Sequence, residues 1–237
     1  MFKIYILKRI IAQQLSKNFW LGHFFSKIKA FSGSYQHRIA KSNTKIVIEG
    51  PPRCGNSSAL RLVIRNNQSF KNKIATHIHR PFQIHYGIKH NLPMIIMLRT
   101  PYMSCISHAA LLIQLNQVKL SNQNQKKQLL LQCIKEYIDF LRIVIEKNFK
   151  NILIFEDYIN NPNLVIKILN SNYDLNLQGT YHSNKDGEDV HVLPNLERDL
   201  IKKEYALLVS ACPKILIKIQ EAQNLYEIAC NNKLSYA

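Results

Sequence analysis

The segment KIVIEGPPRCGNSSALRLV, residues 45–63, decides the fold class of this chain. It opens with a short run rich in β-branched residues, which favour strands, and a turn that contains Gly50 and Gly55 follows. Beyond Gly55 a run of small residues allows a helix to begin. A strand that bends into a helix directs backbone N–H groups and the positive end of the helix dipole at one point. The segment therefore predicts an anion-binding loop that cradles a phosphate.

The loop differs from the one that binds ATP in nucleoside triphosphatases. Their motif, GxxxxGK[ST], places a lysine directly after the second glycine. Here Asn56 and Ser57 follow Gly55, and the cation is Arg53, which lies inside the loop. Two alternatives stay open for the loop taken alone: another phosphate-loop enzyme of kinase type, and a structural turn that carries a surface arginine.

Outward from this loop, short apolar runs alternate with helical patterns. The runs KIVIEG, IATHIH, PMIIML and NILIFE predict strands, and apolar residues at helical spacing from Leu130 to Ile145 predict the helix between the last two. Such alternation is typical of an α/β fold, with a central parallel sheet flanked by helices. Residues 176–190 are polar and predict a surface loop, and two more helices are expected beyond Pro194.

Residues 1–43 form a basic arm that precedes a domain spanning 44–237. The arm carries eight Lys or Arg and no acid, and its apolar residues Ile4, Leu7, Ile11 and Leu15 are spaced for one face of a helix. Its cations interrupt the apolar residues too often for a membrane span. The arm is expected either to pack on the domain or to attach peripherally to an anionic membrane or polymer.

Charge and cysteine content narrow the functional classes. A net charge of +17 calls for an anionic partner, such as nucleic acid, a phosphorylated cofactor, an acidic polymer or a membrane surface. The five cysteines lack any CxxC pair, which argues against a disulfide framework or a thiolate metal site and favours a cytoplasmic, reducing location. His77 and His79 would share one face of a strand, but no carboxylate or thiolate joins them at ligand spacing, so we expect no metal.

Four short motifs in this order resemble the sulfotransferase family. They are Pro52-Arg53-Cys54-Gly55-Asn56-Ser57, ATHIHRP, an arginine–serine pair formed by Arg99 and Ser107 around Pro101, and IFEDYINNP. Each stands at the end of a run that predicts a strand. Together they span residues 45–162, roughly half of the chain.

The resemblance implies a P-loop-like, three-layer sulfotransferase architecture and a reaction. A sulfuryl group would pass from 3′-phosphoadenosine 5′-phosphosulfate to a hydroxyl or amine of a small molecule or carbohydrate, without a metal. His77 would be the catalytic base and Arg53 a catalytic cation, and Arg99 with Ser107 would bind the 3′-phosphate. The remaining donor-binding positions would be Cys54, Gly55, Asn56, Ser57 and Ser58. The acceptor would be held by loops and by the C-terminal helices.

The chain departs from the family pattern at three places. Ser58 stands where the family has an aromatic residue that stacks on adenine, and Ala75 stands where it has a lysine near the sulfuryl group. Its C-terminal arginine segment is matched only by Glu197-Arg198. A non-catalytic relative therefore stays open, as does an acidic-polymer binding module. We expect no specific nucleic acid, because the aromatic residues that alternate with lysines lie in the arm rather than on a strand.

Overall fold

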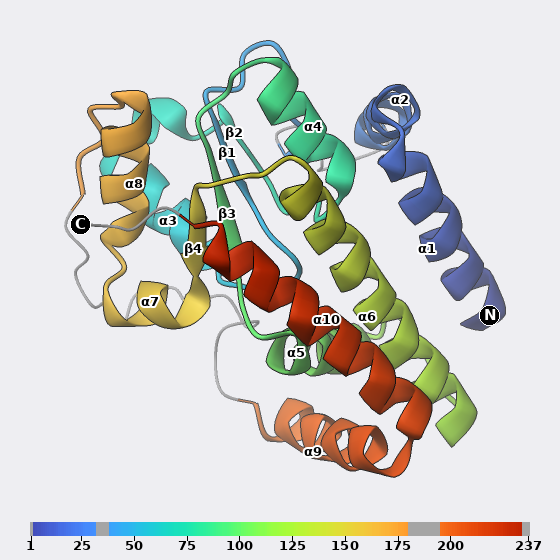
Figure 1. Cartoon of the computed structure of the whole chain (residues 1–237). Coiled ribbons are helices and arrows are strands. Elements are labelled where there is room, and N and C mark those ends of the chain that lie inside the picture. The colour runs from blue at the N-terminus through green and yellow to red at the C-terminus, as the bar shows by residue number, and fades with distance from the viewer. Residues whose placement is uncertain (1, 32–37, 180–194, 234–237) are drawn as a thin grey trace.

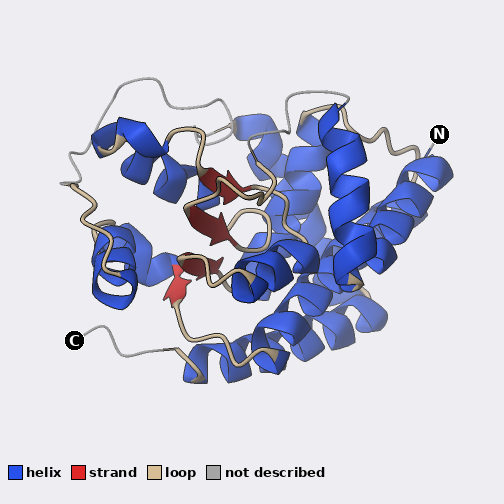
Figure 2. Ribbon diagram, turned by 90° about the horizontal axis from the view of Figure 1, so that it is seen from above, coloured by secondary structure: helices blue, strands red, loops and turns tan. Residues whose placement is uncertain are grey.

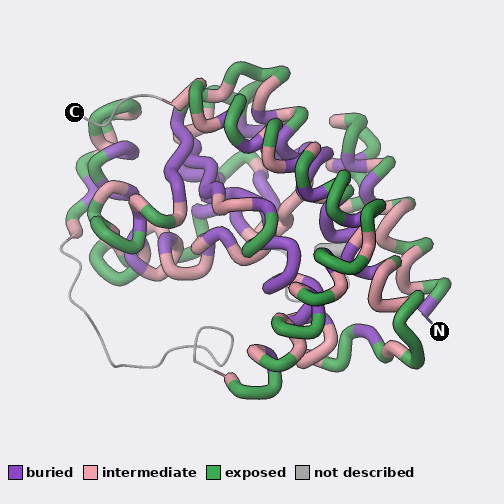
Figure 3. The backbone as a smooth tube through the Cα atoms, turned by 60° about the horizontal axis from the view of Figure 1, so that its bottom comes forward, coloured by how far each residue is buried: buried purple, intermediate pink, exposed green. Residues whose placement is uncertain are grey.

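The computed structural model describes residues 2–31, 38–179 and 195–233, apart from the side chains of 29–31. Its centre is a four-stranded, all-parallel sheet in the order β2-β1-β3-β4 (Figure 1). The strands are β1 (Ile46–Glu49), β2 (Ile74–Thr76), β3 (Met94–Leu98) and β4 (Ile152–Ile154). Every residue in them is buried, as a parallel sheet covered on both faces requires (Figure 3).

Helices cover the two faces of this sheet, which gives three layers (Figures 1 and 2). One layer contains α3 (Asn56–Asn66) and α8 (Leu164–Tyr173). The other contains α4 (Pro81–Lys89), α6 (Gln123–Glu146) and α10 (Pro213–Asn231). The long helix α6 is the predicted crossover, and it leaves β4 parallel to β3. The predicted α/β fold with a helix-flanked parallel sheet is thus confirmed.

The helices that follow β3 and β4 lie at the carboxyl ends of the strands. A short 3-10 turn, η1 (Gln68–Phe70), precedes β2. After β3 comes α5 (Pro101–Gln114), against which α9 (Leu196–Ala211) packs, and α7 (Phe155–Asn160) follows β4. The two helices expected beyond Pro194 are α9 and α10. Of the predicted surface loop, residues 180–190 lie outside the described residues, and 176–179 have no regular structure.

Two predicted strands are shorter than expected. β4 ends at Ile154 because Phe155 begins α7, and β2 ends at Thr76. His77 and His79 have φ angles of 59° and 55°, so the chain turns into the left-handed region instead of staying extended. The prediction that these histidines share one face of a strand is therefore wrong.

The arm begins with α1 (Phe2–Lys17) and α2 (Phe19–Phe31), which pack against each other and against α6 and α4. Arg9 is hydrogen-bonded to both oxygens of Glu136, and Lys17 Nζ lies 3.0 Å from Asp139 Oδ1. Packing on the domain, one of the two expected placements, is therefore confirmed for these helices. Residues 32–37 of the arm lie outside the described residues. Within the described ranges no helix combines the length and apolar character needed to cross a bilayer.

The sheet order determines where a ligand can bind. From β1 the chain crosses to β2 on one side and then returns to β3 on the other side. In open α/β sheets, ligands bind outside the carboxyl ends of the two strands at such a reversal. The loop after β1 and Arg99 after β3 flank this point.

Gly50 allows the loop to leave β1 close to β3. A β-carbon on Gly50 would lie 2.0 Å from the carbonyl oxygen of Met97. Because that atom belongs to the backbone of a central strand, we expect Gly50→Ala to lower the free energy of unfolding by about 3 kcal/mol. Gly87→Ala in α4 is the matched control, because its β-carbon would lie 3.1 Å from Sδ at the flexible end of Met94 and at an ordinary van der Waals distance of 3.6 Å from Val47. Urea unfolding measures both, and equal losses would contradict the role of Gly50.

Candidate functional site

The loop between β1 and α3 is held in shape by its own side chains. Arg53 has a φ of 69°, and Gly55, the N-cap of α3, has a φ of 93°. The buried side chain of Asn56 reaches back over the loop, and its Nδ2 donates to the carbonyl oxygen of Pro51 at 3.2 Å. The loop thus closes on itself at the N-terminus of α3.

The thiol of Cys54 belongs to the packing beneath the loop. It is buried and lies 3.6 Å from the hydroxyl of Ser104, which donates to the carbonyl oxygen of Pro52 at 2.7 Å. Burial raises the pKa of Cys54 to about 12, so the thiol is neutral and unreactive at cellular pH. Only the backbone of Cys54 could contact a ligand.

Arginine side chains from three elements gather beside the loop. Arg53 Nε donates to Ser107 Oγ at 3.0 Å, which brings the phosphate loop and the arginine–serine motif together in space. Burial lowers the pKa of Arg53, and the positive charges of Arg198 and Arg99 lower it further. These guanidinium groups therefore repel one another, and a bound anion would relieve the repulsion. In the sequence, Arg198 matches the family's C-terminal arginine segment only weakly.

Arg99 is positioned by aromatic residues. Its guanidinium lies 4.2 Å from the centre of the Phe155 ring, and the hydroxyl of Tyr137 donates to its carbonyl oxygen. The nearest carboxylate oxygen, in Glu156, is 4.0 Å from Arg99 Nε. Among the described residues this buried Nε has no hydrogen-bond partner. A buried charged donor that lacks a hydrogen-bond partner favours the binding of an anionic ligand.

A cavity of about 450 Å³ lies over the loop and the carboxyl ends of the strands. It brings together most of the predicted site, namely Arg53, Gly55, Asn56, Ser57, Ser58, His77 and Arg99. Cys54 does not line it. Ser107 instead borders an adjoining cavity of about 230 Å³, which it shares with Arg99, Lys202 and Lys203. Phe155 and the two lysines of α9 were not predicted as site residues.

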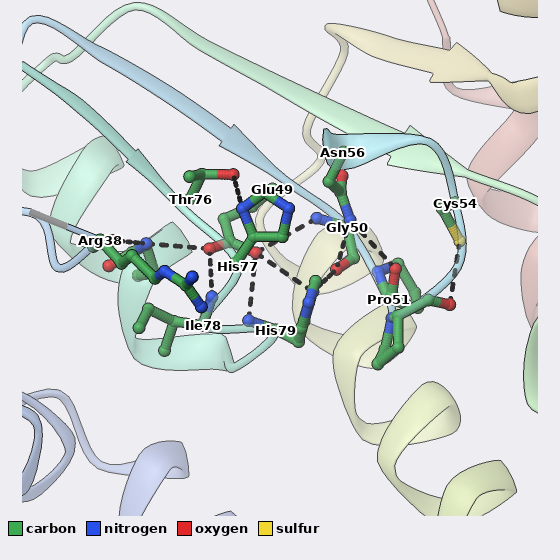
Figure 4. Close-up of polar contacts among 12 residues, drawn as sticks. Arg38, Glu49, Gly50, Pro51, Cys54, Asn56, Thr76, His77, Ile78 and His79 are labelled. Carbon is green, nitrogen blue, oxygen red and sulfur yellow. Dashed lines mark hydrogen bonds and ion pairs between the residues drawn. The ribbon is translucent and has the colours of Figure 1, made fainter. Parts of the chain in front are cut away.

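The two histidines after β2 make different contacts (Figure 4). His77 Nε2 lies 2.7 Å from Ser57 Oγ, and its Nδ1 lies 3.0 Å from Thr76 Oγ1. His79 Nδ1 lies 2.7 Å from the carbonyl oxygen of Gly50. Because a carbonyl only accepts, Nδ1 of His79 carries a hydrogen in this contact.

The carboxylate of Glu49 holds this histidine segment in place, a role the sequence analysis missed. Its side chain is fully buried and accepts the backbone N–H groups of Ile78 at 2.9 Å and His79 at 3.1 Å. Gln83 Nε2 donates to it at 2.9 Å. Burial raises the pKa of Glu49, while His79 and these donors oppose that rise. The available signal was a lone acid at the end of a buried apolar run.

A second cavity of about 410 Å³ lies on the far side of the histidines. It shares His77, His79 and His108 with the first cavity, and its outer wall includes Lys8 and Arg9 of α1. Burial lowers the pKa of His108 well below its ordinary value, so this ring is neutral at cellular pH. The described residues that line the cavity come from the arm, from the loops after β1 and β2, from α5 and the segment after it, and from α6, and none of them lies in α9 or α10.

No metal centre is formed by the residues that the structure describes. No three His, Cys, Asp or Glu side chains among them are placed to hold an ion. His77 and His79 lie with their ring centres 5.8 Å apart and nearly perpendicular.

Replacing Glu49 tests whether its carboxylate organises the segment. In Glu49→Gln an amide N–H₂ must face one of the two backbone N–H groups, which leaves a buried donor unsatisfied. We expect the free energy of unfolding to fall by about 2 kcal/mol. Glu204→Gln is the control, because that carboxylate is 54% exposed and its partner is Lys126 on the surface. A Glu49→Gln protein as stable as the wild type in urea would rule out this role.

Comparison of the chain with protein-family models, with curated proteins and with solved structures finds no match.

Proposed function

We propose that this chain is a sulfotransferase with a P-loop-like fold, which uses 3′-phosphoadenosine 5′-phosphosulfate as donor. The observation that carries the proposal is the hydrogen bond from Arg53 Nε to Ser107 Oγ, 3.0 Å long, between residues 54 positions apart. The resemblance assigns Arg53 to the 5′ end of the donor and Ser107 to its 3′-phosphate. Their contact supports one continuous binding site for a nucleotide phosphorylated at both ends.

The described side chains fit such a donor at three points. The loop and Arg53 would hold its 5′ end at the N-terminus of α3. Arg99 and Ser107, with Lys202 and Lys203 across the adjoining cavity, would hold the 3′-phosphate. The Nε of Arg99, which has no hydrogen-bond partner among the described residues, is a donor for that phosphate.

Phe155 offers the ring that is missing at position 58. It lines the cavity over the loop, whereas the hydroxyl of Ser58 is used within the protein, where it accepts from Tyr158 at 2.7 Å. Stacking of a base on an aromatic side chain contributes about 1–3 kcal/mol. Phe155 can therefore compensate for the aromatic residue that the family has at position 58.

The catalytic step would take place between the two cavities. The donor supplies a sulfur–oxygen bond to phosphate, which breaks as the acceptor oxygen or nitrogen bonds to sulfur. His77 would accept the acceptor's proton at Nε2, which lies 2.7 Å from the loop serine Ser57. Arg53 would stabilise the negative charge that forms on the departing phosphate.

The acceptor would reach His77 through the cavity lined by α1. Charged and amide side chains line it, including Lys8, Gln13, Arg80 and Glu136. These groups suit an acceptor with several polar atoms, such as a carbohydrate or another polyhydroxylated small molecule. All five cysteines are free, which agrees with a reducing compartment such as the cytoplasm.

A magnesium-dependent kinase has weaker support. It would need a phosphate-loop lysine and a carboxylate for the metal. The loop has Asn56 at the lysine position, and Glu49 is occupied by backbone amides.

The first test compares nucleotides by thermal shift. We expect 3′-phosphoadenosine 5′-phosphate to raise the melting temperature more than AMP or ATP with Mg²⁺. Of these three ligands, only the bisphosphate carries a 3′-phosphate that Arg99 would bind. At a hundred times the dissociation constant it should add about 2.7 kcal/mol of stability. Arg99→Ala should abolish the advantage over AMP, whereas Arg142→Ala, at a guanidinium paired with Glu221 on the surface, should keep it. Equal shifts from AMP and the bisphosphate would refute the 3′-phosphate site, and a larger shift from ATP with Mg²⁺ would favour a kinase.

The second test separates the two histidines. If His77 is the base, His77→Ala should lower turnover about 10²–10⁴-fold and leave bisphosphate affinity nearly unchanged. The measurement is sulfuryl transfer to a panel of hydroxyl and amine acceptors by the wild type, His77→Ala and His79→Ala. An active His77→Ala protein beside an inactive His79→Ala protein would move the base to His79. A wild type that binds the bisphosphate but transfers to no acceptor would favour the non-catalytic relative.

A further inference from the structure

The arm helices present apolar side chains on the side that faces away from the domain. On α1 these are Ile4, Leu7 and Ile11, which are 47–60% exposed. On α2 they are Trp20, Leu21, Phe24, Phe25 and Ile28, which are 46–69% exposed. We call these eight residues the outer face. Figure 1 places α1 and α2 together at the edge of the molecule farthest from α8.

The orientation of both helices is fixed by contacts on the opposite side. Gln13 is buried and its Nε2 donates to Asp139 Oδ2 at 3.4 Å, and Arg9 is bound to Glu136. Gly22 lies so close to α4 that a β-carbon would meet the Cβ of Phe82 at 2.7 Å. His23 stacks on Tyr86 with ring centres 5.1 Å apart. The outer face therefore cannot turn inward without breaking these contacts.

Positive charge surrounds the outer face. Lys3, Lys8 and Lys27 are exposed on the same two helices or line the cavity beside them. Lys89 Nζ lies 4.3 Å from the centre of the Trp20 ring. Residues 1–43 contain no acid that could neutralise these cations.

We propose that the outer face is a membrane-docking surface that inserts into the interface of an anionic lipid bilayer. This inference does not depend on the proposed sulfotransferase activity. Tryptophan, phenylalanine and aliphatic residues flanked by lysines are the composition of helices that lie in a membrane interface. The apolar side chains enter the headgroup–acyl boundary, while the lysines extend to the lipid phosphates. A second copy of the chain fits less well, because pairing two outer faces would bring the lysines of both copies together.

The single tryptophan of the chain, Trp20, lies in the outer face and reports directly on its surroundings. The full chain is mixed with vesicles of two parts phosphatidylcholine to one part phosphatidylglycerol, and separately with phosphatidylcholine alone. With the mixed vesicles we expect co-sedimentation and a blue shift of Trp20 fluorescence. Raising the salt from about 0.01 M to about 1 M, which shortens the Debye length from about 30 Å to about 3 Å, should weaken binding.

Paired substitutions locate the surface. Phe24→Ala with Phe25→Ala should lower the vesicle partition coefficient on the order of 10–100-fold, because two aromatic side chains no longer enter the bilayer. Leu207→Ala with Leu216→Ala is the matched control, since these side chains are 70% and 52% exposed on α9 and α10. The control should bind like the wild type, and both variants should keep the wild-type melting temperature.

Three results would overturn the proposal. The first is no binding to the mixed vesicles, and the second is binding without a change in Trp20 emission. The third is a concentration-dependent blue shift in buffer together with a dimer in sedimentation velocity, which would identify the outer face as an interface between two copies.

Discussion

The fully buried carboxylate of Glu49 is the interaction on which the site depends. A charge removed from water is strongly disfavoured unless hydrogen bonds replace its hydration. Glu49 obtains them from the backbone of Ile78 and His79 and from Gln83. Because two of these donors belong to the histidine segment, that segment cannot move without leaving the buried carboxylate short of hydrogen bonds. The left-handed backbone at His77 and His79 is thereby maintained.

Gln83 extends this network toward the N-terminal part of the chain. Its Nε2 also donates to the carbonyl oxygen of Arg38, and its Oε1 accepts from the N–H of Ala40, each at 2.9 Å. The connection that leads from the arm into β1 is therefore tied to the same carboxylate as the histidines. One buried charge thus links the strand end, the candidate base and the segment that follows the arm helices.

Much of the fold could be predicted because each strand is a short apolar run that ends in a recognisable turn. The loop residues and Arg99 could be placed at one edge of the sheet, since parallel strands end together. The end of β2 at Thr76 could not be predicted, because the left-handed turn that follows it depends on Glu49, which lies more than twenty residues earlier. Phe155, Lys202 and Lys203 were missed because they enter the site through tertiary packing of α7 and α9. The side of α1 that faces the domain could not be predicted either. Its partners there are polar residues of α6, so the apolar pattern of α1 does not mark that side.

The contact between Arg9 and Glu136 has a consequence for how the chain is made. The two residues are 127 positions apart, and at ordinary rates of synthesis about 6–25 s separate their appearance from the ribosome. Throughout that interval α1 has no α6 to pack against, whereas α4, the partner of α2, is complete much earlier. During synthesis, the contacts of both arm helices with α4 can therefore form before the ion pairs between α1 and α6. These ion pairs are long-range contacts, so the entropy cost of closing a long loop must be met before they stabilise the arm.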